Sequence, residues 1–237
     1  MNVTQRKAAI IIGVLILAQM AGSALVNFFA EAPLFEGAGF LVNAATHSTQ
    51  IAAAVFLAIL IEATWVAIAI LAFPVIAERS TRLALALFAI TIGCVVIGVI
   101  ENSAVMSMVS VSQAYSTGSA TDRVQLEAIR GVVSAARNWP HLLGRMFDGV
   151  AALVFYVALF RFALIPRAIS AVGMIAVPSM LTGLAMPFFG HPVIFPLLAL
   201  LGLTQLITAL WLIVRGFNEG MPDSFAPLNY AFRSPQS

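Results

Sequence analysis

One stretch of the chain carries side chains that can do chemistry together, because Ser134, Arg137, His141, Arg145 and Asp148 recur every three or four residues. That spacing places all five on one face of a helix. A guanidinium on such a face can hold an anionic group or a carboxylate from a neighbouring helix. The stretch is therefore the first candidate for a functional site.

Two further acidic residues, Glu62 and Glu101, lie inside long apolar stretches, and Asn102 follows Glu101 directly. Ionisable groups inside a membrane span usually mark a substrate, ion or proton path. Because sequential spans joined by a short loop are usually neighbours, we expect Glu101 to pair with Arg145. Asp148 is too short to reach the membrane surface and Arg145 is one turn away, so we expect these two to pair with each other or with Glu101.

The candidate site has more carboxyl groups than cationic groups. Glu62, Glu101 and Asp148 face only Arg145 and, when it is protonated, His141. A low-dielectric environment disfavours the charged form of an acid. We expect at least one carboxyl to be protonated at neutral pH, and Glu62 first, because no basic residue lies within a helical turn of it. These acids are the expected proton or cation positions. The alternative is a polar network that only holds the helices in register.

Three histidines, His47, His141 and His191, all fall at the outer ends of predicted spans. Three imidazoles with a nearby acid can hold a zinc ion that keeps one open position. Their spacing matches no known zinc motif, and separate solvated histidines are the alternative. A metal site at these histidines is the second hypothesis.

The elements that position these residues are membrane helices. Hydrophobic residues make up 61% of the chain and charged residues 9%, whereas a soluble domain carries about 25% charged residues. This composition excludes a soluble globular protein, and a net charge of +2 gives no sign of nucleic-acid binding. Stretches long and apolar enough to cross a bilayer are Ala8–Phe29, Thr49–Ile76, Leu83–Ser110, Pro140–Phe160, Ile169–Phe189 and Ile194–Val214.

The expected fold class is all-α: a polytopic membrane protein in which residues 1–237 form one bundle of six transmembrane helices. Basic residues flank the spans unequally, which places both termini in the cytoplasm. The more basic side holds Arg6, Lys7, Arg79, Arg82, Arg161, Arg167, Arg215 and Arg233, and the other side holds Arg123, Arg130 and Arg137. We expect a multi-pass protein of the bacterial inner membrane.

Two connections on the outer side have structure of their own. Residues 30–48 hold a proline and two glycines among apolar residues, and can lie in the membrane interface or dip inward. Val124–Trp139 has apolar positions at helical spacing, which predicts an amphipathic helix that runs into the fourth span with a kink at Pro140. Residues 221–237 have no apolar run and form an expected cytoplasmic tail.

Several segments resemble a bacterial membrane-protein family, domain-of-unknown-function family 4386. They read AILAFPVIAERS, VIGVIENSAV, AARNWPHLLGRMFDGVAALVFYVALFRFALIPRAISAVGMI and TALWLIVRGF. The chain departs from the family pattern at Asn138, where an aspartate is expected, and at Pro140–His141. The resemblance implies a six-helix integral membrane protein and carries over no activity, cofactor or catalytic residue.

The function that the residues favour is a small transporter, or a protein that binds a small molecule or lipid. Its site would be formed by Glu62, Glu101, Asn102, Arg145 and Asp148. A membrane-embedded, metal-dependent hydrolase that uses the three histidines is one alternative, and a structural or accessory subunit of a membrane complex is another. A role other than enzyme is preferred, and no cofactor is identified. Membrane lipids are expected partners; a small-molecule ligand, a membrane-protein partner and a second copy of the chain stay open.

Overall fold

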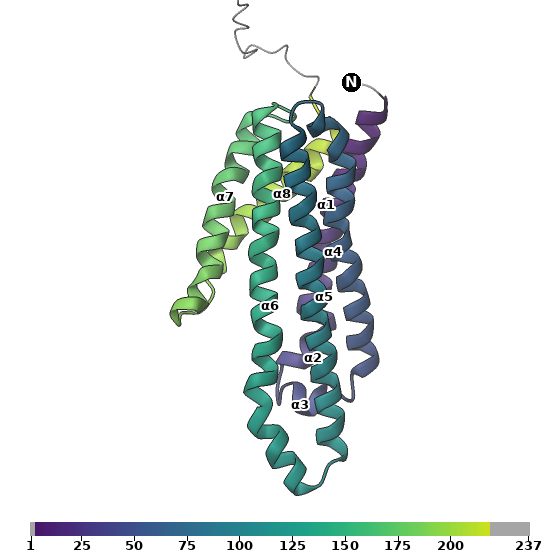
Figure 1. Ribbon diagram of the computed structural model, residues 1–237, viewed down its shortest axis with the longest axis vertical. Helices are drawn as coiled ribbons and strands as arrows, with labels where there is room; N and C mark the ends of the chain where they lie inside the picture. The colour runs from purple at the N-terminus through teal and green to yellow at the C-terminus, as the bar shows by residue number, and fades with distance from the viewer. Residues whose placement is uncertain (1–2, 219–237) are drawn as a thin grey trace, which may run out of the picture.

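Six long helices dominate the computed structural model, which describes residues 3–218 (Figure 1). Each of the six is long and apolar enough to cross a membrane, so the expectation of an all-α, multi-pass membrane protein is confirmed. The predicted tail at 221–237, with Arg233, lies outside the described residues. The elements are α1 (Val3–Leu25), a π-helical turn η1 (Val26–Ala30), α2 (Ala32–Phe35), α3 (Phe40–Asn43), α4 (Ser48–Ala77), α5 (Thr81–Thr117), α6 (Ala120–Arg161), α7 (Arg167–Ala185), a 3-10 turn η2 (Met186–Phe189) and α8 (Pro196–Val214).

The long helices form a closed ring. Each packs against the next in the order α1, α4, α5, α6, α7 and α8, and α8 returns to α1. We call the end that holds the N-terminus and the α4–α5 and α6–α7 turns the terminal end, and the end that holds the α5–α6 turn the hairpin end. In Figure 1 the terminal end is at the top, and α7 leans away from α6 toward the bottom.

The α5–α6 hairpin is longer than a membrane is thick. Helix α5 has 37 residues and α6 has 42, which at 1.5 Å per residue makes them about 55 and 63 Å long, against a hydrocarbon layer of about 30 Å. The Ser119 amide donates to Asp122 Oδ2 (2.9 Å), and the Asp122 amide donates to Ser119 Oγ (3.3 Å), so a capping box starts α6. The expected helix at Val124–Trp139 is present and continues without interruption through Pro140; the kink there stays a prediction.

The segment between η1 and α4 is folded onto α5. Its apolar side chains Leu34, Phe40, Leu41 and Ala44 are buried and pack with Val105, Met108 and Val109. Ser112 of α5 fixes the segment further, because its Oγ accepts from the Ala45 amide (2.8 Å) and donates to the Leu41 carbonyl (2.9 Å). Residues 30–48 therefore form a packed cap at the hairpin end.

The terminal half of the bundle is filled by apolar side chains. The largest buried cluster contains Ile12, Ile68, Ile76, Leu87, Phe155, Tyr156, Leu159, Leu164, Ile165 and Val177. Close packing depends on Gly173 of α7, where a Cβ would lie 2.5 Å from the Tyr156 ring of α6. The hairpin half is built differently, because its centre is polar.

Candidate functional site

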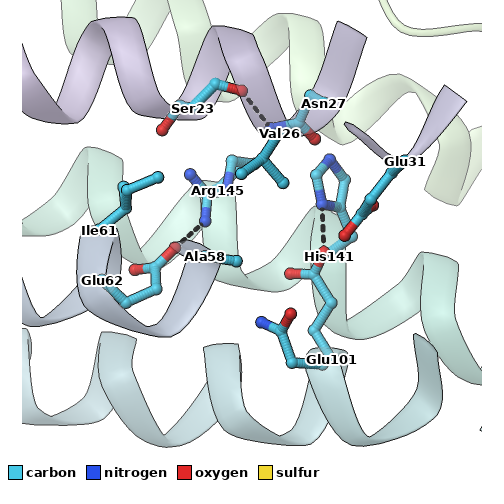
Figure 2. A pocket seen from close by; sticks show the side chains of 11 residues that line it. Ser23, Val26, Asn27, Glu31, Ala58, Ile61, Glu62, Glu101, His141 and Arg145 are labelled. Atoms are coloured by element: carbon cyan, nitrogen blue, oxygen red, sulfur yellow. Dashed lines mark hydrogen bonds and ion pairs between the residues drawn. The ribbon is translucent and has the colours of Figure 1, made fainter. Parts of the chain in front are cut away.

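A small cavity lies in the hairpin half between α1, α4, α5 and α6. Most of the residues that line it are polar, and Figure 2 shows their side chains converging from several helices. They are Ser23, Val26, Asn27, Glu31, Ala58, Ile61, Glu62, Glu101, Asn102, His141 and Arg145. The space has room for about one water molecule, far less than the roughly 300–1,000 Å³ of a typical small-molecule pocket. In this conformation it suits a proton, a water or a small ion.

Arg145 joins two carboxyl groups at the deeper side of the cavity. Its Nη2 contacts Glu62 Oε1 of α4, and its Nη1 lies 3.1 Å from Asp148 Oδ2, one turn further along α6. Gly98 of α5 makes room for this arrangement, because a Cβ at that position would lie 2.9 Å from Glu62 Cγ. We call Glu62, Arg145 and Asp148 the inner layer. The predicted contact between Arg145 and Asp148 is present.

Arg137 joins two other carboxyl groups nearer the hairpin end. Its Nη2 lies 2.8 Å from Glu31 Oε2 and 3.2 Å from Glu101 Oε1. The same Glu101 oxygen lies 2.7 Å from His141 Nδ1. The guanidinium also sits over the ring of Phe35, 4.8 Å from its centroid. We call Glu31, Glu101, Arg137 and His141 the outer layer.

The two layers together hold an excess of acid. They contain four carboxyl groups, two guanidinium groups and one imidazole. Even when His141 is protonated, one negative charge has no cationic partner within the cluster. A buried unpaired charge is strongly unfavourable, so this arrangement is suited to taking up a proton or another cation. Glu31, just past the first span, shows this tendency: burial raises the pKa of its carboxyl, and the Arg137 guanidinium opposes that rise only in part.

Asn102 adds an unused acceptor to the cavity wall. Its side chain is 4% exposed, and its Nδ2 donates to the Gly98 carbonyl (2.8 Å). Its Oδ1 has no hydrogen-bond partner in the described part of the chain. Buried polar atoms are almost always hydrogen-bonded, so this oxygen points to a donor that enters the cavity, such as a water or a protonated group.

Exposed aromatic rings mark the depth of the site. Trp139 of α6 and Phe188 of η2 lie 5.3 Å apart between ring centroids, and both are more than 40% exposed. Such rings gather at the boundary between membrane and water. Arg145 and Asp148 follow Trp139 by six and nine residues, which places them roughly 9 and 13 Å deeper at 1.5 Å per residue. The inner layer thus lies in the half of the membrane nearer the hairpin end, and Arg137 of the outer layer lies at the level of the boundary.

The structure brings the predicted site residues together but changes two of their partners. Glu62, Glu101, Asn102, Arg145 and Asp148 all belong to the cavity wall or the inner layer. Among the described residues, Glu101 is paired with Arg137 and His141, and not with Arg145. Glu62, which has no basic residue within a helical turn on its own helix, is paired with Arg145 of α6. Those expectations rested on neighbours along one helix or in adjacent spans, whereas α4 and α6 meet at the cavity from either side of α5.

Two residues of the outer layer were assigned elsewhere from the sequence. Arg137 was counted with the basic residues of the outer side and Glu31 falls in the outer connection 30–48, yet they are 6% and 2% exposed. For Arg137 a signal existed, because it shares a helix face with His141 and Arg145. For Glu31 there was none, since its position depends on how the segment after η1 folds back.

The three histidines do not come together. His47 Nδ1 lies 2.9 Å from the Asn43 carbonyl of its own turn, His141 contacts Glu101, and His191 is exposed beyond η2. Within residues 3–218, no three His, Cys, Asp or Glu side chains are grouped so that they could hold a metal ion. The expected zinc site at His47, His141 and His191 therefore lacks the required geometry, because His47 precedes α4, His141 lies in the middle of α6 and His191 follows η2.

Comparison with known proteins places the chain in a family. Residues 11–216 match the model of a family described as a domain of unknown function, DUF4386. No curated protein and no solved structure matches the chain. The matched range includes every residue of the inner and outer layers and all or part of each long helix. The chain therefore belongs to the DUF4386 family.

Proposed function

We propose that this protein is a small proton-coupled transporter whose buried cluster holds an exchangeable proton. The observation that carries the proposal is the pairing of each arginine with two carboxyl groups: Arg145 with Glu62 and Asp148, and Arg137 with Glu31 and Glu101. Each layer then has one carboxyl more than it has guanidinium groups. A proton on that carboxyl removes the excess charge, and such groups in membrane spans commonly belong to proton relays.

The size of the cavity favours a proton over a larger ligand as the resident species. Room for about one water molecule is enough to connect Glu62, Glu101 and the free Asn102 oxygen. A solute of ordinary metabolite size would enter only after the surrounding helices separate. We therefore assign the cluster the role of coupling site and leave the transported solute unassigned.

The residues of the two layers have different roles in this proposal. Glu62 and Asp148 share the exchanged proton. Arg145 keeps both carboxyl groups oriented, and its positive charge disfavours the state in which both are protonated. His141, 29% exposed in its side chain, receives a proton from the hairpin side and passes it toward the cavity through Glu101. An imidazole suits this step because each of its two ring nitrogens can accept or donate a proton.

Infrared spectroscopy tests for the held proton. Purified protein in lipid at pH 7 is expected to show the carbonyl band of a protonated carboxyl, and Glu62→Gln or Asp148→Asn should remove or shift it. Glu127→Gln is the matched control, because Glu127 forms an exposed ion pair with Arg130 on the same helix, 3.2 Å apart. Absence of a protonated carboxyl band in the unmodified protein at pH 7 would contradict the proposal.

Proton passage is measured separately in liposomes that enclose a pH-sensitive dye. After an acid step outside, vesicles with the unmodified protein and with Glu127→Gln are expected to acidify faster than empty vesicles. Glu62→Gln should acidify at the rate of empty vesicles while remaining folded. If the unmodified protein and Glu62→Gln acidify at the same rate, the cluster does not pass protons.

We also propose that the protein lies in the bacterial inner membrane with the terminal end in the cytoplasm. Support comes from the Arg and Lys residues near the terminal end, which outnumber those at the hairpin end. In protein with Cys94→Ala, a membrane-impermeant thiol reagent added to whole cells should label Ser119→Cys, next to the α5–α6 turn, and should miss Ser80→Cys, next to the α4–α5 turn. The reverse pattern would invert the orientation.

A further inference from the structure

One short segment, Glu31–Phe35, borders the cavity at its hairpin end through Glu31, and we call it the covering segment. In Figure 2 Glu31 lies at the end of the row of lining side chains, beyond His141. Glu31 is 2% exposed and its Oε2 lies 2.8 Å from Arg137 Nη2. Phe35, four residues on, lies over the same guanidinium. Arg137 is therefore held between two side chains of this segment.

The covering segment begins at a helix irregularity. Helix α1 changes to a π-helical turn at Val26–Ala30, where the Glu31 amide donates to the Val26 carbonyl (2.9 Å) instead of to a carbonyl four residues back. Single π-helical turns inside α-helices occur frequently at functional sites. Val26 and Asn27 of this turn also line the cavity. A change in this turn therefore moves the covering segment and the cavity wall together.

The covering segment ends at two glycines and a fixed anchor. Gly37 and Gly39 have φ values of +56° and +78°, a region that favours glycine. A Cβ at Gly39 would also lie 2.7 Å from Arg130 Nη2, so the chain passes close to α6 there. Beyond them, Ser112 holds the Leu41–Ala45 stretch to α5. The segment thus lies between the π-helical turn and two glycines whose backbone can change conformation easily.

We propose that Glu31 and Phe35 close the cavity at the hairpin end by clasping Arg137, and that the segment opens by movement at the π-helical turn and at the two glycines. The inference rests on the proposed function only in treating the cavity as a site that must be reached from the hairpin side. Opening breaks the Glu31–Arg137 contact, lifts Phe35 from the guanidinium and withdraws Leu34 from its packing against α5. Protons or a small ion then reach Glu101 and the interior of the cavity.

Thiol labelling measures this access directly. In protein with Cys94→Ala, Ala58→Cys places a reporter on the cavity wall, and a charged, membrane-impermeant maleimide is added to proteoliposomes from the hairpin side. Glu31→Ala removes one half of the clasp and Phe35→Ala the other. Glu127→Ala is the control, because it removes an exposed ion pair on α6 that does not touch the cavity. Thermal unfolding of each variant establishes that it is folded.

Slow labelling is expected in the background protein and in Glu127→Ala. Glu31→Ala is expected to label roughly tenfold faster or more, since loss of a hydrogen bond to a charged group shifts an opening equilibrium by about that factor. Phe35→Ala, whose side chain is about half exposed and whose loss leaves the core intact, should label several-fold faster. If Glu31→Ala does not fold, the labelling rate of Phe35→Ala alone tests the proposal.

Two results would overturn the proposal. One is labelling of the background protein as fast as that of a cysteine on the free surface of the α5–α6 hairpin. The other is labelling of both clasp variants, or of Phe35→Ala alone where Glu31→Ala is unfolded, at the rate of Glu127→Ala. Neither depends on whether the cluster carries protons, because the infrared measurement reports on that independently. A closed cavity with no protonated carboxyl would therefore refute the proposed function and leave the clasp intact.

Discussion

The hairpin half and the terminal half of the bundle share α1, α4, α5 and α6 but bury different kinds of side chain. In the terminal half, α4, α5, α6 and α7 meet through alanine, leucine, isoleucine and aromatic side chains. In the hairpin half, α4, α5 and α6 meet through Glu62, Glu101 and Arg145 around a cavity. Glycines show the same contrast: Gly173 admits an aromatic ring, whereas Gly98 admits a charged side chain.

From this contrast we infer that the terminal half mainly stabilises the fold and that the hairpin half carries the candidate site. A buried ion pair is commonly no more stabilising than apolar side chains of the same volume, because removing charges from water is unfavourable. The terminal half shows that apolar packing can fill this bundle. The acids and arginines of the hairpin half are therefore not required to fill space, and we attribute them to function. The predictions below set the two halves against each other.

The largest expected effect is from Arg145→Ala, which leaves Glu62 and Asp148 without their shared partner. Removing one side of a buried pair destabilises by about 3–5 kcal/mol. Reversible unfolding in detergent measures the change in the free energy of unfolding. Glu127→Ala, which removes an exposed pair with Arg130, should change it by less than about 1 kcal/mol. Equal values for the two variants would mean that water reaches the inner layer freely and that the halves differ less than we state.

Overpacking tests the terminal half. Gly173→Ala would place a Cβ 2.5 Å from the Tyr156 ring, and inserting a methyl group into a well-packed core destabilises by about 1–3 kcal/mol. Gly202→Ala on α8 is the matched control, because nothing lies within 4 Å of its added Cβ. It should be neutral, or stabilising by up to about 1 kcal/mol. The same unfolding measurement serves both, and a tolerated Gly173→Ala would show that α6 and α7 are loosely packed.

Gly98→Ala asks whether the hairpin half responds differently to the same change. The added Cβ would lie 2.9 Å from Glu62 Cγ, and a flexible side chain moves aside more easily than a ring. We expect a destabilisation of about 1 kcal/mol or less, below that of Gly173→Ala. Displacement of Glu62 from Arg145 should nevertheless shift the carboxyl band in infrared spectra. A large stability loss with an unchanged band would assign Gly98 to packing alone.

The smallest effect is expected at the polar contact within the terminal half. Tyr156 Oη lies 3.1 Å from Thr208 Oγ1 of α8, and hydrogen bonds between membrane helices contribute about 0.6 kcal/mol on average. Tyr156→Phe should destabilise by that order without changing the infrared carboxyl bands. A double-mutant cycle with Thr208→Val isolates the contact. A coupling above about 2 kcal/mol would show that polar contacts matter in this half as well.

The sequence by itself determined the fold class and the members of the inner layer. Long apolar stretches require helices in a membrane, because a helix satisfies its own backbone hydrogen bonds. Arg145 and Asp148 are three residues apart, so local geometry alone brings them together. Asp148 and Glu62 stood out because acids are rare among apolar residues.

Only the tertiary structure decided which helices face each other and therefore which charged side chains form pairs. Arg145 meets Glu62 across the cavity because the ring places α4 and α6 on either side of α5. Glu31 enters the cluster because the chain folds back after a π-helical turn, and a π-helical turn has no reliable sequence signal. The three histidines are separated for the same reason. Periodicity fixes the face of one helix, but the orientation of that face toward its neighbours depends on packing over the whole bundle.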